Sequence, residues 1–340
     1  MTDSAPIVTI FGAAGFVGRA VVRRFARAGW RVRAGTRRPQ RAKFLRTLGE
    51  LGQVVPVAAN VRLPSTLLPV VQGARAVVNL AGILAPTGKQ TFAAVHVDGA
   101  ANAANAAAAA GATSFVHVSA IGADPSVRSD YARTKGLAEL RALECFAATS
   151  VLRPSIVFGP EDQFFNRFAA VMRIAPAMPV PGGGLVRLQP VYVNDVAEAT
   201  FRTATMSEAA GQTYELGGPR ARSLIDILRW TREEVSRRCV LVPIPFALLW
   251  PPALLMECLP SPPFDPRPAP PARQRQRRVR QRGHALGPRH RTHRVRGYRP
   301  GVSRAFPTWG RVGGLTARCI SLDLTRLSRG DRALLESSTQ

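Results

Sequence analysis

Short apolar runs alternate with longer amphipathic or alanine-rich stretches through the first half of the chain. Runs of strand length that are rich in β-branched residues lie at 7–11, 30–37, 53–60, 74–82 and 113–123. Most stretches between them place apolar residues three or four positions apart, and 96–112 is alanine-rich, as helices often are. Strands that alternate with helices predict an α/β fold, a doubly wound parallel sheet covered by helices.

The second half of the chain predicts additions to this sheet and a smaller lobe. A sixth strand is expected at 149–160, and strands near 189–194 and 213–217 are expected to join the same sheet. We therefore expect residues 1–160, with the two later strands, to form the core domain. Residues 161–262 are less regular and predict a small C-terminal lobe that carries the substrate-side or partner-side surface.

Two segments of the lobe carry helix signals. Ser223 followed by Asp226 is typical of a capping box, which would begin a helix there. The apolar run 240–260 approaches membrane-spanning length, but five prolines and Glu257 interrupt it. It favours a buried or interfacial helix, packed on the lobe, against a partner or on a membrane surface, and we expect no transmembrane segment.

Beyond residue 262 the periodic pattern ends and the composition changes. Residues 264–340 hold eighteen arginines, no lysine and four acidic residues, and so carry more than half of the formal net charge of +26. So polar and proline-rich a composition predicts disorder for residues 263–340. Because the whole chain has 44 arginines and only three lysines, a GC-rich gene translated in a shifted frame is our first explanation of this tail.

A genuine basic arm is the alternative explanation of the tail. It would bind nucleic acid or anchor the chain on a membrane surface. Tyr298 and Phe306 are the aromatic residues near the densest arginine run, and stacking on single-stranded nucleic acid needs more of them. Nucleic acid is therefore the least favoured partner.

The remaining composition narrows the class of protein. With 46% hydrophobic residues, the chain is able to bury a substantial core. Its four cysteines are scattered without paired or C-x-x-C spacing, so neither a disulfide framework nor a metal site is expected. A reducing, cytoplasmic compartment fits this cysteine usage, and no signal peptide is expected before the first strand.

The segment FGAAGFVG, residues 11–18, joins the first strand to the first helix. Gly12 permits a tight turn, Gly15 lets the backbone approach a pyrophosphate, and Gly18 allows close packing of the helix. The helix N-terminus offers free N–H groups to the anion. The motif predicts a dinucleotide site of the Rossmann type, lined by Gly12, Ala13, Gly15, Phe16, Val17 and Gly18.

The end of the second strand distinguishes two forms of the cofactor. An NAD site commonly has an acidic residue there, whereas this chain has Gly35 and Thr36, followed by Arg37 and Arg38. Arginine pairs with a 2′-phosphate through charge-assisted hydrogen bonds. The sequence therefore favours NADP(H) over NAD(H). The alternative is that both side chains are solvated surface arginines.

Further motifs give residues 5–220 a family resemblance. They are the spaced glycines, NLAG after the fourth strand, Ser119 after the fifth, Tyr131-x-x-x-Lys135 and LRPSIVFGP. Together they resemble the extended or atypical short-chain dehydrogenase/reductase superfamily, of the NAD-dependent epimerase/dehydratase type. HVSAIGAD, YARTKG and QPVYVNDVAEA are similar to bacterial relatives of the nucleotide-binding accessory subunit of respiratory complex I (NADH:ubiquinone oxidoreductase).

The resemblance implies a tightly held nicotinamide dinucleotide and a partner. The partner would be complex I or another membrane-associated complex, with the protein peripheral on the cytoplasmic face of the inner membrane. Asn60 stands where relatives often have an acidic residue that contacts adenine. Residues at matching positions are expected to contact the cofactor as well, namely Asn60, Val61, Leu80, Ala81, Gly82, Tyr131, Lys135, Pro154 and Val157.

Tyr131 and Lys135 lie four positions apart, on one face of a predicted helix. A nearby ammonium and an oxidised nicotinamide would bring the pKa of the tyrosine hydroxyl down toward a value useful in general acid–base catalysis. Ser119 would then polarise the substrate oxygen. The alternative is that Tyr131 and Lys135 clamp the nicotinamide ribose without turnover.

Two histidines bear on this choice. His96 takes the place of an asparagine that supports a proton-relay water in many relatives, which favours the clamp. A role for His96 as an independent general base is the alternative, and His117 is expected to be structural. We therefore expect mainly a nucleotide-holding binding or assembly component. The competing function is an NADPH-dependent reductase, dehydrogenase or epimerase that acts on a small carbonyl or sugar-like substrate.

Overall fold

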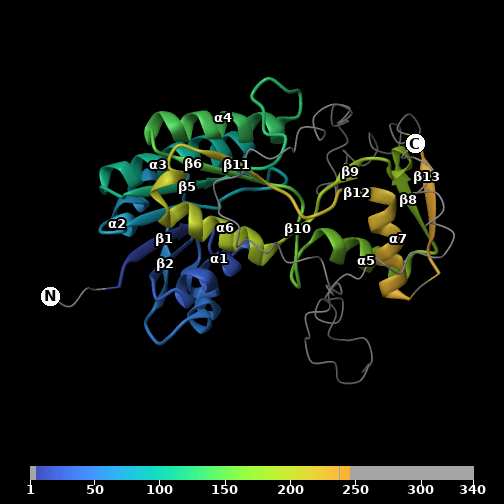
Figure 1. Cartoon of the computed structure of the whole chain (residues 1–340), viewed down its shortest axis with the longest axis horizontal. Coiled ribbons are helices and arrows are strands. Elements are labelled where there is room, and N and C mark those ends of the chain that lie inside the picture. The colour runs from blue at the N-terminus through green and yellow to red at the C-terminus, as the bar shows by residue number, and fades with distance from the viewer. Residues whose placement is uncertain (1–4, 237, 246–340) are drawn as a thin grey trace.

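A seven-stranded sheet, all of whose pairings are parallel, forms the centre of the molecule (Figure 1). The computed structural model describes residues 5–236 and 238–245. In spatial order the strands are β3 (Val54–Ala58), β2 (Arg31–Thr36), β1 (Ile7–Phe11), β4 (Ala76–Asn79), β5 (Ser114–Val118), β6 (Ser150–Pro154) and β11 (Thr213–Leu216). The predicted doubly wound α/β fold is confirmed.

Helices cover both faces of the sheet. One face carries α1 (Phe16–Arg27) and α6 (Val193–Thr205), and the other carries α2 (Leu68–Val71), α3 (Asp98–Ala109) and α4 (Asp130–Cys145) (Figure 1). Short 3₁₀ helices lie at Pro39–Leu48, Pro64–Thr66, Gly182–Gly184 and Ser207–Ala209.

Each face buries the apolar positions that the sequence pattern identified. On α1, Val21, Val22 and Phe25 are fully buried, and the Phe25 ring meets those of Trp30 and Phe201 edge-on at 5.3 and 5.1 Å between centroids. Such aromatic pairs contribute about 0.5–1.5 kcal/mol each beyond the burial of their surface. They fix α1, whose N-terminus faces the predicted nucleotide, against the sheet.

The opposite face is built from small side chains. Ala100, Ala103, Ala104 and Ala107 of α3 are fully buried between the sheet and α4. Alanine has the highest helix propensity and lets helices approach closely. The helix is preceded by a π-helical turn, Ala93–Val97, so the helical segment begins three residues before the predicted 96.

The region after β6 differs from the prediction. The strand expected over 149–160 divides into β6 and β7 (Val157–Phe158), and β7 pairs with β10 (Val191–Tyr192) in a separate two-stranded sheet. The strand expected near 189–194 therefore does not join the main sheet, whereas the one near 213–217 does, as β11. Apolar positions from Val193 onward recur at helical spacing, so the chain turns into α6 directly after β10.

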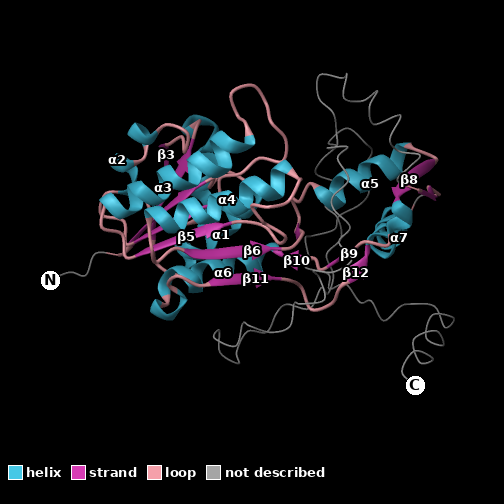
Figure 2. Cartoon of the chain, turned by 90° about the horizontal axis from the view of Figure 1, so that it is seen from above, coloured by secondary structure: helices cyan, strands magenta, loops and turns pink. Residues whose placement is uncertain are grey.

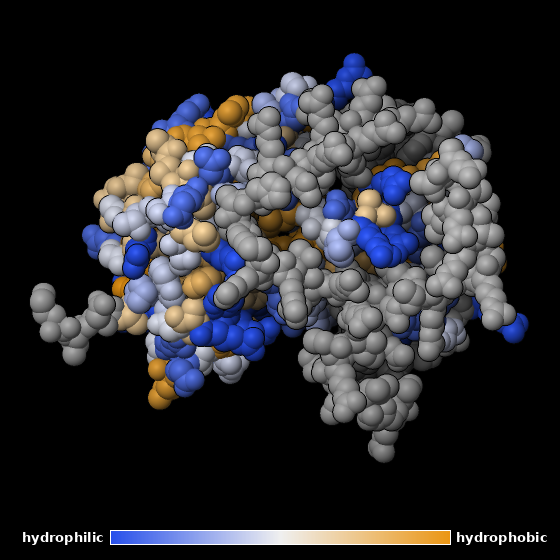
Figure 3. Space-filling view, in the orientation of Figure 1, coloured by the Kyte–Doolittle hydropathy of each residue, from blue (hydrophilic) through white to orange (hydrophobic). Residues whose placement is uncertain are grey.

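A small lobe follows beyond the end of the sheet at which β6 continues into β7 (Figure 2). Its elements are α5 (Phe164–Ile174), β8 (Ala177–Pro181), β9 (Arg187–Leu188), β12 (Arg222–Ser223), α7 (Leu224–Val235) and β13 (Val240–Ile244). Met172, Met178, Val180, Leu228 and Cys239 form its core. On the visible face of the molecule, apolar and hydrophilic residues interleave (Figure 3).

The two helix signals of the lobe have different outcomes. Ser223 begins α7 as predicted, because its Oγ accepts the Asp226 N–H at 3.2 Å. The helix expected over 240–260 is wrong for its first residues, since β13 pairs in parallel with β8. Pro243, inside that segment, disfavours a helix. The rest of the run and the whole of 263–340, with the predictions made for them, lie outside the described residues.

Within the described part of the chain, no helix combines the length and the apolar character needed to cross a membrane.

Candidate nucleotide-binding site

The glycine turn between β1 and α1 has the geometry that only glycine permits. Gly12 has φ +77°, and a Cβ on it would lie 2.9 Å from the Leu80 carbonyl group. A Cβ on Gly18 would lie 2.3 Å from the Gly12 carbonyl oxygen. The turn therefore packs directly on the end of β4 and on the first turn of α1. Gly15, the N-cap of α1, is exposed, which leaves the helix N-terminus open to an anion.

This turn lies where the strand order reverses. β1 pairs with β2 on one side and with β4 on the other, and ligands of such sheets bind outside the carboxyl ends of the strands at this point. The other predicted residues also follow carboxyl ends of strands: Arg37 and Arg38 after β2, Asn60 and Val61 after β3, Leu80, Ala81 and Gly82 after β4, Ser119 after β5, and Pro154 and Val157 at the end of β6 and start of β7. The fold thus brings them to one edge.

The residues after β3 are held by local hydrogen bonds. The Asn60 Oδ1 accepts the Arg62 N–H at 3.2 Å, and the Val61 carbonyl accepts a hydrogen bond from Asn102 of α3 at 2.9 Å. The Val61 side chain packs toward Gly99, also on α3. Val61 is therefore a buried support, and Asn60 is half-buried with its amide oxygen already engaged.

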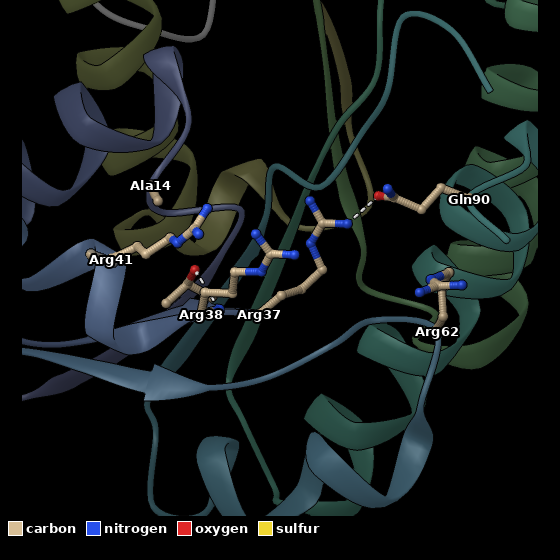
Figure 4. A pocket seen from close by; sticks show the side chains of 8 residues that line it. Ala14, Arg37, Arg38, Arg41, Arg62 and Gln90 are labelled. Carbon is tan, nitrogen blue, oxygen red and sulfur yellow. Dashed lines mark hydrogen bonds between the residues drawn. The ribbon is translucent and has the colours of Figure 1, made fainter. Parts of the chain in front are cut away.

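Beside the end of β2 lies a pocket of about 580 Å³ whose lining includes four arginines (Figure 4). Sequence reasoning identified Arg37 and Arg38 but missed Arg41 and Arg62. Arg41 comes from the 3₁₀ helix and Arg62 from the loop after β3, so their convergence depends on the fold. The remaining lining residues are Ala14, Thr36, Ala42 and Gln90.

Among the residues that the structure describes, no acidic side chain lines this pocket. The guanidinium of Arg37 donates to the Gln90 Oε1 (Figure 4). Arg62 Nη1 donates to the Lys89 carbonyl at 2.8 Å. These two partners are neutral acceptors, so the positive charge of the pocket is not compensated by them. The pocket is electrostatically suited to an anion.

At the other end of the site, α4 carries Tyr131 and Lys135. Lys135 is buried, and its Nζ donates to the Val118 carbonyl at 3.2 Å. Burial lowers the pKa of this ammonium from 10.5 to about 8, against the opposing effect of Glu139. A Cβ on Gly82 would lie 3.3 Å from Lys135 Nζ, so the loop after β4 reaches this lysine.

In the protein alone Tyr131 has a raised pKa, and the lowering expected with an oxidised nicotinamide bound stays a prediction. Burial raises the pKa of the hydroxyl above 10.0, because the phenolate would be poorly solvated. Its ring stands edge-on to those of Phe92 and His96, with centroids 6.0 and 5.5 Å away. In the protein alone the hydroxyl is therefore protonated and ready to donate.

His96 is a fully packed side chain. Its Nε2 accepts the Ile83 N–H at 3.1 Å, and its Nδ1 lies 3.0 Å from the Thr134 hydroxyl on α4. Burial, and then the charge of Lys135, lower the pKa of His96 from 6.5 to about 4. The ring is neutral near pH 7 and links the loop after β4 to α4, which disfavours an independent general-base role.

His117 and Ser119 lie on β5 and just after it. His117 is buried, its Nδ1 lies 3.3 Å from Asn79 Nδ2, and burial lowers its pKa to about 3, which agrees with a structural role. The Ser119 Oγ is buried and has no hydrogen-bond partner among the described residues. An unsatisfied buried hydroxyl beside Lys135 is what a site for a polar ligand would leave. The described residues contain no cluster of His, Cys, Asp or Glu that is suited to bind a metal ion.

The glycine turn, the arginine pocket and the unsatisfied Ser119 hydroxyl together fit a nicotinamide dinucleotide. The model of the NAD dependent epimerase/dehydratase family matches residues 8–217. The chain belongs to this family. Within the family it is 32% identical over 243 residues to the mitochondrial NADH-ubiquinone oxidoreductase 40 kDa subunit of Neurospora crassa, covering 72% of this chain and 64% of that protein.

A second relative has an enzymatic name. The ceramide reductase of Caulobacter vibrioides is 34% identical over 197 residues, which cover 58% of this chain and 60% of that protein. The structure of MoeE5 in complex with UDP-glucose and NAD has a TM-score of 0.59 at 20% identity and covers 70% of this chain and 85% of that one, a likeness in fold.

These comparisons confirm the family and the resemblance to the complex I subunit. The chain spans between 54% and 66% of the length of the mitochondrial subunits it matches. NAD is named in the family and in the MoeE5 complex, so a nicotinamide dinucleotide is the family's cofactor. The individual site residues stay predictions.

Proposed function

We propose that this protein holds NADP(H) and acts mainly as a nucleotide-bearing component of a protein complex. The observation that carries the choice of nucleotide is the four-arginine pocket beside the end of β2. Arg37 and Arg38 follow the strand whose end contacts the adenosine ribose in such folds. A 2′-phosphate in this pocket supplies the negative charge that its lining lacks, and NAD(H) would bind more weakly.

The state of Tyr131 and Lys135 supports holding over turnover. Lys135 is engaged with a backbone carbonyl, and burial raises the pKa of Tyr131. His96, neutral and packed, ties α4 to the loop after β4. A bound dinucleotide supplies the hydride chemistry, whereas Tyr131 and Lys135 would orient it by hydrogen bonds to its ribose.

The proposed partner is complex I or another membrane-associated complex, reached from the cytoplasmic face of the inner membrane. The support is the similarity to the mitochondrial NADH-ubiquinone oxidoreductase subunit, which extends over 72% of this chain.

Native mass spectrometry of the full-length protein, purified from its own cells, tests this proposal. We expect NADPH or NADP⁺ to remain bound, and the protein to fractionate with a membrane complex. A protein that binds neither NADPH nor NADP⁺, or that occurs free in the cytosol without partners, contradicts it.

A second function, a reductase, dehydrogenase or epimerase of a small carbonyl or sugar-like substrate, is favoured by one observation. The Ser119 Oγ is buried without a partner near Lys135, where it would bind a substrate oxygen. The similarity to a ceramide reductase adds to this. Consumption of NADPH with a panel of carbonyl compounds, abolished by Tyr131→Phe, would establish this function in place of the first.

A further inference from the structure

The loop after β4 crosses from one end of the candidate site to the other. Its residues 83–91, called the strap from here on, begin at Ile83 beside His96. Thr87 and Gln90 exchange backbone hydrogen bonds of 3.1 and 3.0 Å, and Gly88 between them has φ +55°. This tight turn fixes the backbone at Gln90 and presents its side chain to the arginine pocket.

The strap is attached to the pocket by two arginines. Arg37 donates to the Gln90 amide oxygen, and Arg62 donates to the Lys89 carbonyl at 2.8 Å. Both arginines line the same pocket as Arg38 and Arg41 (Figure 4). Two of the four guanidinium groups that would receive an anion are therefore engaged with the strap.

The two kinds of acceptor differ in strength. An amide oxygen offers a neutral hydrogen bond, whereas a phosphate monoester offers three charged oxygens and hydrogen bonds about twice as strong. A phosphate that enters the pocket will therefore compete with the Gln90 oxygen for the Arg37 guanidinium. A ribose hydroxyl is neutral and gains no such advantage over the amide.

We propose that Gln90 is an internal occupant of the phosphate site, and that its exchange with a 2′-phosphate on Arg37 sets the preference between the two nucleotides. This rests on the proposed function. Gln90 satisfies Arg37 when the nucleotide has a free 2′-hydroxyl, so NAD(H) is accepted. With a 2′-phosphate present, Arg37 turns to the phosphate and the Gln90 side chain is released, while Arg62 keeps its hydrogen bond to the Lys89 carbonyl.

The other end of the strap is held in place near the proposed nicotinamide end of the site. Both the N–H and the carbonyl of Ile83 lie within 3.1 and 3.2 Å of His96 Nε2, and His96 contacts Thr134 on the helix that carries Tyr131. The Ile83 end of the strap is thus fixed by His96, and its Lys89–Gln90 end is the one that the arginines contact. Occupation of the phosphate site changes the freedom of the Gln90 side chain only.

Binding of two small probes to single variants tests the exchange. The probes are 2′,5′-ADP and 5′-AMP, which differ by the 2′-phosphate alone, and isothermal titration calorimetry measures both. Gln90→Glu places a permanent carboxylate on Arg37 and should weaken 2′,5′-ADP about tenfold or more, with less than a twofold change for 5′-AMP. Gln90→Ala frees Arg37 and should tighten 2′,5′-ADP about twofold to fivefold.

Gln72→Glu is the matched control, because Gln72 is exposed and precedes β4 at the opposite edge of the sheet. It adds the same charge and should change neither probe by more than about twofold. Equal weakening of both probes by Gln90→Glu, or weaker 2′,5′-ADP binding to Gln90→Ala, overturns the exchange. If the wild-type protein prefers 2′,5′-ADP and Gln90→Glu changes neither affinity, the exchange is wrong but the proposed function stands. If the wild-type protein does not bind 2′,5′-ADP, the proposed function is wrong as well.

Discussion

The two ends of the candidate site differ in how well their ionisable side chains are solvated. At the adenosine end, Arg37, Arg38 and Arg41 are exposed, and Arg37 is engaged there by a neutral acceptor. At the proposed nicotinamide end, Lys135 is buried and Tyr131 half-buried, and burial lowers the pKa of Lys135 to about 8 and raises that of Tyr131. One end keeps its charge in water, whereas at the other end burial destabilises charged forms, although a pKa of about 8 leaves Lys135 mostly protonated at pH 7.

This difference separates two properties of the site. The charged end has much to gain from a dianion, so we expect it to set the preference between nucleotides. The buried end gains little from an added charge, so we expect it to orient the nicotinamide half and to control proton transfer. Perturbations of one end should therefore leave the other nearly unchanged, which the following experiments examine in order of expected size.

Acidification should affect the buried end most. His96 has a pKa of about 4 in the folded protein and about 6.5 when unfolded, so the unfolded chain binds a proton first as the pH falls. Stability that is complete above pH 6.5 is lost progressively toward pH 4, by on the order of 3 kcal/mol for this histidine. Urea unfolding at pH 7, 6, 5 and 4.5 measures it. His96→Asn should reduce the slope with pH, and an unchanged slope contradicts the assignment.

Removal of the charge at the adenosine end should abolish the nucleotide preference. In Arg37→Ser/Arg38→Ser, NADPH should lose about 100-fold in affinity, since hydrogen bonds to charged groups contribute about 1.5–3 kcal/mol each. NADH should lose at most about threefold. Fluorescence titration with both nucleotides measures this. Arg27→Ser/Arg31→Ser, which removes two exposed arginines away from the carboxyl ends of the strands, is the control. Equal losses for both nucleotides would refute the prediction.

Replacement of the buried lysine should separate stability from binding. In Lys135→Met the buried ammonium is removed, so the free energy of unfolding at pH 7 should rise by about 2 kcal/mol after the lost hydrogen bond is counted. Since the folded pKa of about 8 lies below the unfolded 10.5, this gain should shrink between pH 8 and 10.5. NADPH and NADH should weaken equally, by about tenfold. Lys43→Met, an exposed counterpart, should change none of these.

The smallest expected effect is that of salt on the ratio of the NADPH and NADH affinities. An increase of NaCl from 50 to 500 mM shortens the range of electrostatic interactions and should weaken NADPH about threefold more than NADH. Titration calorimetry of the wild-type protein at both salt concentrations measures the ratio. A ratio that stays constant would mean that the arginines do not contact the 2′-phosphate.

The features that sequence reasoning found are those fixed by local sterics. Gly12 and Gly18 were predicted because a tight turn followed by a closely packed helix demands glycine whatever surrounds it. The parallel sheet follows from the alternation of strands and helices, whereas its strand order was not predicted. Arg41, Arg62 and Gln90 were missed because they come from three separate segments of the chain, and only the folded sheet brings these segments together.

The raised pKa of Tyr131 was missed for a related reason. The spacing of Tyr131 and Lys135 shows that they share a helix face, but the burial that dominates their protonation depends on Phe92, His96 and the loop after β4. Similarly, the strand expected near 189–194 is reduced to β10, and the chain enters α6 at Val193, because the apolar positions of α6 pack on α1 and on the face of the sheet rather than at its edge.

The scarcity of lysine makes this site unusually easy to observe. Of the three lysines in the chain, Lys89 lies in the strap, Lys135 is buried beneath the nicotinamide end, and Lys43 is exposed elsewhere. An amine-reactive label should thus modify Lys43 and Lys89 within minutes and Lys135 slowly. With so few sites, intact-mass and peptide analysis can report nucleotide occupancy through the labelling rates of Lys89 and Lys135, measured relative to the rate of Lys43.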